Sequence, residues 1–349
     1  MSRSEPIRRK LDLKNGRVDL SHGAGGRAMG RLIEDIFHQA FDNDWLRAGN
    51  DQSAFEVGAG RMVMTTDGYV VSPLFFPGGD IGCLAVNGTI NDVAMAGARP
   101  LYLTASFIIE EGFSFADLKR IAVSMGEASR AAGVPIITGD TKVVERGKAD
   151  GVFVTTAGIG IIPQGINLSS DKARPGDVAI VSGTMGDHGV AVMSKRENLE
   201  FEIEILSDSA PLHTLVADMV EAVGPALRVM RDPTRGGLAA TLNELAHSSK
   251  VGFAIEEAAI PIRAEVAAAC EFLGLDPLNV ANEGKLVAIV APEAAEKLLA
   301  AMKAHPLGKD AAIIGRAVED DQHFVEMRTA FGGGRIVDWL AGEQLPRIC

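Results

Sequence analysis

The chain has 349 residues, of which 47% are hydrophobic and 23% are charged, a composition typical of a globular protein with a large core. Its formal net charge of −12 argues against general binding to nucleic acid or to anionic membranes, because both require a basic surface. There is no apolar run of about 18 residues and no signal-peptide core. We therefore expect a cytoplasmic protein without disulfides.

The first half of the chain alternates between strand and helix patterns. Residues 61–66 alternate in hydrophobicity and end at Asp67-Gly68, which predicts a strand followed by a turn. The stretch 80–98 is rich in Ala, Leu, Val and Met and predicts a buried helix. Ser114 is the expected N-cap of a second helix. That helix covers residues 114–132, and further strands are expected at 100–110, 135–140 and 151–162.

A loop-like stretch at residues 163–176 predicts a boundary between two domains. We expect residues 1–165 and 166–331 to form the domains, and residues 332–349 to form a flexible tail, because three glycines follow Phe331. The second domain also mixes strands and helices, so the predicted fold class is α/β (α+β). Its expected strands are 177–182, 251–256, 285–291 and 311–318, with a turn at 183–189 and helices at 212–223, 236–248, 263–273 and 293–304.

Four short clusters that contain aspartate fall near strand and helix junctions of the first domain. They are Asn50-Asp51, Asp67-Gly68, Asn91-Asp92 and Gly139-Asp140. Carboxylate oxygens of this kind suit Mg²⁺, which prefers carboxylates, water and phosphate oxygens. Each cluster alone is more typical of an ordinary turn. Four of them in one domain indicate a magnesium site.

Two glycine-containing segments are candidate phosphate sites. Residues 21–30 open a helix and match the letters of a dinucleotide fingerprint, but they lack the acidic residue expected about 20 positions later. A glycine-rich cover over phosphates, with Arg27 contributing charge, is the alternative. The segment from Arg231 to Gly237, which contains Asp232, turns into a helix N-terminus and is a ready anion site.

Five side chains are considered for covalent or acid–base chemistry: the three cysteines, Lys142 and Glu283. Cys349 is the last residue, and a thiol on a loose tail can reach places that a core thiol cannot; a frayed chain end is the alternative. Cys83 and Cys270 lie in apolar runs without CxxC spacing, so we interpret both as buried and inert. Lys142 is either a phosphate ligand or a solvated lysine. Glu283 precedes a strand and is either a surface acid or a general base.

The order of these motifs resembles the superfamily of aminoimidazole ribonucleotide synthetase, selenophosphate synthetase and thiamine-monophosphate kinase. Within it, the chain resembles the HypE family of hydrogenase maturation factors. The terminal Pro-Arg-Ile-Cys349 is the most specific match, because the sister enzymes lack it. The other matching segments are 21–26, 66–68, 87–98, 138–145, 231–237 and 282–286, which with the C-terminus span nearly the whole chain.

The resemblance implies a two-domain aminoimidazole ribonucleotide synthetase-like fold that binds ATP and Mg²⁺ in its cleft. It implies a homodimer joined through the N-terminal domains, with the strand at 100–110 near the interface. The implied Mg²⁺ ligands are Asp51, Asp67, Asp92 and Asp140. The implied nucleotide-binding residues are the same four aspartates with Asn91, Arg27 and Asp232.

The resemblance also implies a reaction and its partners. HypF would load a carbamoyl group on Cys349, and ATP-dependent dehydration would convert it to a thiocyanate. The HypC–HypD complex would accept the cyano group, which becomes a cyanide ligand of the nickel–iron hydrogenase centre. Lys142 and Glu283 match positions thought to help activation and deprotonation.

Two other classes of function remain open at this point. A sister kinase or synthetase that acts on a free small molecule would turn over ATP without Cys349. A non-catalytic docking protein, whose tail binds a partner through Leu345 and Ile348, would hydrolyse no ATP.

Overall fold

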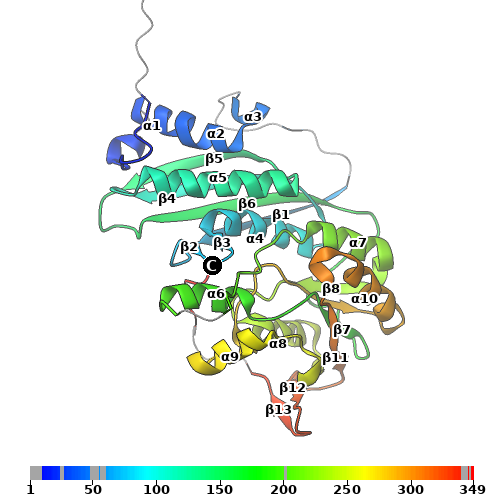
Figure 1. The fold of residues 1–349 in the computed structure, drawn as a ribbon. Coiled ribbons are helices and arrows are strands. Elements are labelled where there is room, and N and C mark those ends of the chain that lie inside the picture. The colour runs from blue at the N-terminus through cyan, green and yellow to red at the C-terminus, as the bar shows by residue number, and fades with distance from the viewer. Residues whose placement is uncertain are drawn as a thin grey trace, which may run out of the picture.

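The computed structural model describes residues 10–23, 27–47, 55, 60–199, 203–338, 345 and 347–349. Within these ranges the chain forms two α/β halves that meet along one junction, with the C-terminus beside that junction (Figure 1). Asp51 and part of the glycine-rich segment lie outside the described residues. Arg27 begins a helix, and its side chain is likewise outside the description.

The first half is built on a four-stranded sheet. Its order is β1 (Arg61–Tyr69), β6 (Val152–Ile162), β4 (Arg99–Glu110) and β5 (Ile136–Val144). β4 and β5 run parallel, and the other neighbours are antiparallel. The strands at 100–110, 135–140 and 151–162 are therefore confirmed. The predicted turn at residues 67–68 is wrong, because β1 continues to Tyr69 and pairs with β6 along its whole length.

Two long helices cover one face of this sheet. α4 (Ile81–Met95) begins where the Asp80 carboxylate accepts hydrogen bonds from two backbone N–H groups of the first turn. α5 (Phe115–Ala132) begins at Ser114, as predicted, and ends at Gly133 in the left-handed conformation. Both helices bury apolar side chains against the sheet. The opposite face of the sheet has no helix over it in the described part of the chain, and Met64 there is 72% exposed.

The second half is built on a seven-stranded sheet. Its order is β13 (Gly334–Ile336), β12 (Val325–Arg328), β9 (Gly252–Glu256), β11 (Ala312–Val318), β7 (Val178–Val181), β10 (Val287–Val290) and β8 (Leu227–Arg231). Both faces are covered, so its central strands are apolar throughout. In β7, Ala179 and Val181 join the core on one face, and Ile180 joins the core on the other.

The helices of the second half lie on both sides of that sheet. They are α6 (Asp187–Arg196), α7 (His213–Val223), α8 (Gly237–Ser249), α9 (Ala264–Leu273) and α10 (Ala295–Ala304). α8 packs on one face, while α7 and α10 pack together on the other. The predicted turn at 183–189 is shorter than expected, because α6 begins at Asp187 and buries Val190 and Val192. Among the helices of the described ranges, none has the length and apolar character needed to span a membrane.

Short elements complete the fold. The N-terminal helices α1 (Arg27–Leu32), α2 (Gln39–Phe41) and α3 (Asp44–Arg47), with the π-helical turn η2 (Ile33–His38), lie beside β5 and α5. β2 (Phe75–Phe76) and β3 (Gly79–Asp80) form a hairpin. Single 3₁₀ turns are η1 (Leu20–Gly23), η3 (Gly224–Ala226), η4 (Glu257–Ala259), η5 (Pro277–Asn279), η6 (Pro292–Ala294) and η7 (Pro306–Gly308).

The tail differs from the flexible arm expected from residue 332. Residues 334–336 form β13, which pairs with β12 and extends the sheet. The last residues return to the first half, where the backbone N–H of Val70 donates to the carbonyl of Cys349 at 3.0 Å. The N–H of Ser72 donates to the carbonyl of Arg347 at 3.1 Å. The chain end is therefore docked at the junction between the halves, close to α6 and the β2–β3 hairpin (Figure 1).

Candidate active site

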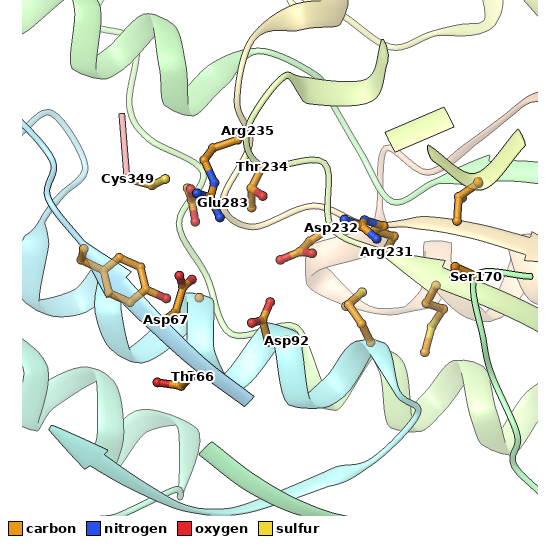
Figure 2. Close-up of a pocket in the computed structure, with 15 residues that line it drawn as sticks. Thr66, Asp67, Asp92, Ser170, Arg231, Asp232, Thr234, Arg235, Glu283 and Cys349 are labelled. Carbon is orange, nitrogen blue, oxygen red and sulfur yellow. The ribbon is translucent and has the colours of Figure 1, made fainter. Parts of the chain in front are cut away.

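A cavity of about 450 Å³ lies at the junction between the two halves. Asp67, Asp92 and Asp232 point into it from three different elements, and Glu283 and Cys349 also line it (Figure 2). Five of the residues predicted from the sequence thus meet in one place. The complete lining is Thr66, Asp67, Tyr69, Gly88, Asp92, Met95, Ser170, Met230, Arg231, Asp232, Thr234, Arg235, Leu245, Glu283 and Cys349.

β1 and α4 form the wall contributed by the first half. α4 can lie close to β1 because Gly88 has no side chain, and a Cβ there would collide with the hydroxyl of Tyr69. Because the helix lies so close to the strand, Asp67 on β1 and Asp92 on α4 line the same cavity. The hydroxyl of Thr65 donates to the Asp92 carboxylate at 2.8 Å and fixes its orientation.

The turn from β8 into α8 forms the opposite wall. Gly237 adopts a φ of +60°, and a Cβ there would lie 2.6 Å from the carbonyl oxygens of Leu278 and Val280. Only glycine suits this combination of conformation and crowding. The tight turn directs Asp232, Thr234 and Arg235 into the cavity (Figure 2).

Glu283 is the most deeply buried acid of the site, with only 3% of its surface exposed. Its backbone N–H donates to the Asp208 carboxylate at 3.0 Å, and its carbonyl accepts from Asn91 at 3.0 Å. Side-chain atom Oε1 has no hydrogen-bond partner in the structure. Burial, followed by repulsion from Asp232 and other nearby carboxylates, raises the pKa of Glu283 well above its usual value. The unpaired oxygen and the raised pKa are the features expected of a proton-transfer group.

The cavity concentrates negative charge. Burial, followed by repulsion from the nearby Asp92, raises the pKa of Asp232 to about 7. Burial is also the largest cause that raises the pKa of Asp92, against which Arg231 and Arg235 act in the opposite direction. The carboxylates therefore repel one another when all are ionised. A cation bound among them would relieve that repulsion.

Cys349 is the only cysteine that lines the cavity, among the residues that the structure describes. Cys270 is buried, and burial raises the pKa of its thiol to about 11. Cys83 is half-buried at the start of α4, and burial raises the pKa of its thiol too. Both internal thiols are thus held in the unreactive protonated form.

Asp140 and Lys142 lie away from this cavity. Both are on β5, and the Lys142 ammonium contacts the Asp140 carboxylate at 2.8 Å. That hydrogen bond is the largest cause that lowers the pKa of Asp140. β5 and β1 are opposite edges of the four-stranded sheet, three strand spacings or about 14 Å apart. Asp67 and Asp140 of one chain are therefore not brought together. Asp140 borders a separate, aromatic-lined cavity under the N-terminal helices.

Asn91 takes part in a contact between the halves and is not among the described residues that line the cavity. Its Nδ2 donates to the carbonyls of Ala210 and Glu283, both at 3.0 Å. Its Oδ1 accepts from the N–H of Leu212 at 2.7 Å. The amide therefore joins α4 to the loops that precede α7 and β10. Both amide protons and the carbonyl oxygen of Asn91 are thus engaged in contacts between the halves.

Sequence reasoning missed several lining residues. Tyr69 was hidden by the turn expected at residues 67–68, although the alternation from Thr65 through Asp67 continues to it. Thr234 and Arg235 were contained in the predicted anion-binding turn without being singled out. Ser170 comes from the loop between the domains, and no local pattern marks it.

Among the residues that the structure describes, no group of three or more His, Cys, Asp or Glu side chains is arranged to hold a metal ion. Asp67 and Asp92 nevertheless offer the carboxylate oxygens that Mg²⁺ prefers. Mg²⁺ usually takes one or two carboxylates together with water and substrate phosphates. The pair suits a metal that arrives with a phosphate ligand.

Comparison with known proteins places this geometry in a family. Residues 49–162 match the N-terminal domain of the AIR synthase related proteins, and residues 174–328 match their C-terminal domain. The chain is 77% identical over 342 residues to the carbamoyl dehydratase HypE of Rhizobium leguminosarum bv. viciae, with 98% of each chain covered.

Solved structures agree with that result. A crystal structure of HypE in complex with ATP has a TM-score of 0.91 to this chain at 50% identity, and covers 95% of this chain and 99% of its own. The HypE chain of a HypE–HypF complex has a TM-score of 0.78 at 51% identity, and covers 88% of this chain and 99% of its own. Since both domain types match and so similar a relative spans nearly its whole length, the chain belongs to the HypE family of carbamoyl dehydratases.

Proposed function

We propose that this chain dehydrates a carbamoyl group that it carries on Cys349, with the use of ATP, in the maturation of hydrogenase. The observation that carries the proposal is the location of the Cys349 thiol, which lies at a cavity formed by acidic side chains from both halves. A chain end docked at this cavity brings a substrate carried on its thiol to the acidic side chains. The alternative of a sister kinase is therefore less favoured than a self-loaded substrate.

ATP is the proposed co-substrate, with Mg²⁺ held by Asp67 and Asp92 and supported by Asp232. The mutual repulsion of these carboxylates favours a bound cation. Mg²⁺, when bound, would offset charge on the transferred phosphoryl group. Arg231 and Arg235 line the same cavity and provide positive charge for phosphate oxygens. The HypE–ATP complex is a close structural relative and supports nucleotide binding here.

The chemistry follows from the poor leaving group of a thiocarbamate. Its carbamoyl oxygen accepts the γ-phosphoryl group of ATP, and ADP is released. The carbon–oxygen bond then breaks with phosphate as the leaving group, and the nitrogen loses both protons. A carbon–nitrogen triple bond forms, and Cys349 carries a thiocyanate. Glu283, whose unpaired Oε1 belongs to a side chain that lines the same cavity as Cys349, is the proposed acceptor for a nitrogen proton.

Asp140 and Lys142 enter this proposal differently. Because they lie on the edge strand opposite β1, they can act at an Asp67 site only from a second copy of the chain. We keep Lys142 as a candidate for stabilising charge during phosphoryl transfer on that condition. Asp51 and Arg27 remain proposed nucleotide ligands on the strength of the sequence motifs alone.

Replacing Asp67 or Asp92 by Asn is expected to weaken Mg²⁺–ATP binding by about tenfold to a hundredfold, as loss of a charged ligand does. The change keeps the size of the side chain and removes its charge. Isothermal titration with Mg²⁺–ATP would measure the effect. Asp321→Asn, in an exposed loop of the second half, is the matched control and should bind as the parent does. Unchanged affinity in both site variants would contradict the proposal.

HypF is the proposed carbamoyl donor and the HypC–HypD complex the proposed cyano acceptor. The HypE–HypF complex among the structural relatives supports the first. We keep 1–165 and 166–331 as the proposed domain limits, but Val337 is tied to Val325 and Asn243, so residues 332–337 pack with the second half. Eleven residues follow position 338 and span at most about 38 Å. The three cysteines form no disulfide with one another, which suits the cytoplasm as the proposed compartment.

A homodimer through the open face of the first sheet is the proposed assembly. β4, the strand expected near the interface, is an inner strand of the sheet, and its outer face shares an uncovered surface with β1. Met62, Met64 and Ile108 on that surface are exposed apolar side chains. A second copy placed there would bury them.

We expect Met64→Glu to convert a dimer to a monomer, because two buried, unpaired charges would face each other across the interface. Light scattering at micromolar concentration would measure the mass. Phe272→Glu is the matched control, since Phe272 is equally exposed, at 72%, but lies on α9 in the other half. A parent that is monomeric, or a Met64→Glu protein that remains dimeric, would rule out this interface.

A further inference from the structure

The docked chain end is held by side chains that the proposed chemistry does not use. His188, on α6, is fully buried, and its Nε2 lies 2.9 Å from the carbonyl oxygen of Ile348. Ile348 itself is buried in the core of the junction, together with Leu345. The residue before the terminal thiol is thus fixed by a polar contact on its backbone and by apolar packing of its side chain.

The hydrogen-bond pattern defines the tautomer of His188. A carbonyl oxygen can only accept, so Nε2 carries the proton that binds Ile348. Nδ1 then accepts from the hydroxyl of Ser207 at 2.8 Å. The oxygen of that hydroxyl accepts the N–H of Ser209 at 3.1 Å, which leaves its proton free for the imidazole. Burial lowers the pKa of His188 and keeps the ring neutral. An edge-on contact with Phe76, with centroids 5.4 Å apart, fixes the ring plane.

Arg196, in the last turn of α6, makes a second polar contact with the chain end. Its Nε donates to the carbonyl of Ser72 at 2.8 Å, and its Nη2 donates to the carbonyl of Arg347 at 2.8 Å. The side chain of Arg196 therefore bridges the chain end and the segment 70–72 that hydrogen-bonds to it. Arg347 in turn forms an ion pair with Asp150.

The loop that orients His188 also contacts the proposed base. Asp208 lies between Ser207 and Ser209, and its carboxylate accepts the backbone N–H of Glu283 at 3.0 Å. Lys285 contacts the same carboxylate at 3.2 Å. One short loop therefore connects the contact that holds the chain end with the backbone of Glu283.

We propose that His188 and Arg196 are positioning residues, which form a latch that holds the terminal thiol at the cavity. His188 binds the carbonyl of Ile348, and Arg196 binds the carbonyl of Arg347. The latch must open when the thiol is loaded by an external donor, and it must close for dehydration. This inference builds on the proposed function, but the latch itself exists in the unloaded chain and can be measured there.

Two substitutions at one position test the contact with Ile348. The amide nitrogen of Gln can occupy the place of imidazole Nε2 and donate to the Ile348 carbonyl. The amide nitrogen of Asn reaches only the place of Nδ1 and cannot make this hydrogen bond. We expect His188→Asn to raise the rate at which iodoacetamide alkylates Cys349 by about tenfold, as loss of a buried hydrogen bond predicts. His188→Gln should stay within about threefold of the parent. Peptide mass spectrometry separates Cys349 from the two internal cysteines.

A second pair keeps the test decisive if the buried position does not tolerate change. Arg196→Met retains the apolar stem and removes the donors, and should also accelerate alkylation severalfold. Lys195→Met removes an equal charge from the neighbouring exposed position and should not. Equal alkylation rates for Arg196→Met and Lys195→Met would overturn the latch. Equal rates for His188→Asn and His188→Gln would do so too, provided that both proteins melt as the parent does. Because alkylation needs neither carbamoyl donor nor ATP, a failure of the proposed dehydration would leave this result unaffected.

A loaded protein gives the second readout. In single turnover with ATP, Arg196→Met should dehydrate its carbamoyl group about tenfold more slowly than Lys195→Met, while it is loaded by the donor at least as fast. Slow loading together with normal dehydration would contradict a positioning role.

Discussion

Cys349→Ser is expected to abolish the carbamoyl adduct while leaving the chain end docked. Serine keeps the shape of cysteine, and the backbone contacts to Val70 and Ser72 do not depend on sulfur. The hydroxyl has a far higher pKa than a thiol and is a weak nucleophile without an adjacent base. Intact-protein mass spectrometry with the proposed donor HypF, its carbamoyl source and ATP would follow the reaction. The parent should gain one carbamoyl group and then lose one water.

The control for this experiment is Cys270→Ala. Cys270 is buried and its raised pKa keeps it protonated, so the adduct should form as in the parent. The substitution leaves a small cavity in the core, so a modest loss of thermal stability is the expected side effect. An adduct of full size on the Cys349→Ser protein would show that another residue accepts the carbamoyl group.

The sequence predicted the elements whose start and end signals are local. α5 is an example, since Ser114 and Gly133 cap it at the two ends. β1 was predicted too short, because Asp67 and Gly68 are typical of turns; pairing with β6 carries the strand through them. α6 was hidden by the glycines before it, and its stability comes from burial of its valines between the halves. Tertiary packing, which no local pattern records, decided both cases.

The sequence predicted most of the residues of the site, but it did not predict which of them come together in space. Asp67, Asp92, Asp232, Glu283 and Cys349 do converge, although they come from parts of the chain up to 282 positions apart. Strand order separates Asp140 from them, and strand order is a property of the whole sheet. Asn91 illustrates the same limit, because its neighbour Asp92 faces the cavity while its own amide joins the two halves.

The location of the chain end changes how the arm is understood. A freely swinging tail would spend little time at the cavity, whereas a docked tail with buried Leu345 and Ile348 is already in place for dehydration. Under the proposed function, loading by an external donor would require those two side chains to leave the core. The docked conformation and the conformation needed for loading thus exclude each other, and the free energy of docking sets their relative populations.

Glu283→Gln should stop dehydration and spare loading. Glutamine has the same size, so the contacts of the backbone with Asp208 and Asn91 persist, and Cys349 should still receive its carbamoyl group. The amide cannot accept the nitrogen proton, and loss of a general base typically costs about 10²–10⁴-fold in rate. A single-turnover mass experiment would show carbamoylated protein that fails to lose water when ATP is added. Glu296→Gln, on the exposed side of α10, is the matched control and should dehydrate as the parent does.

The pH dependence provides an independent test of the same role. A base acts in its ionised form, and burial with repulsion from neighbouring acids raises the pKa of Glu283, so it holds its proton to a higher pH than an ordinary glutamate. Dehydration by the parent should therefore fall as the pH is lowered through this raised pKa, above the usual carboxylate range. A bound cation among Asp67, Asp92 and Asp232 would reduce that repulsion and move the fall to lower pH. The residual rate of Glu283→Gln should lack this acidic fall. If the variant keeps both the rate and the pH profile of the parent, the proton leaves by another group and Glu283 serves only to join the two halves.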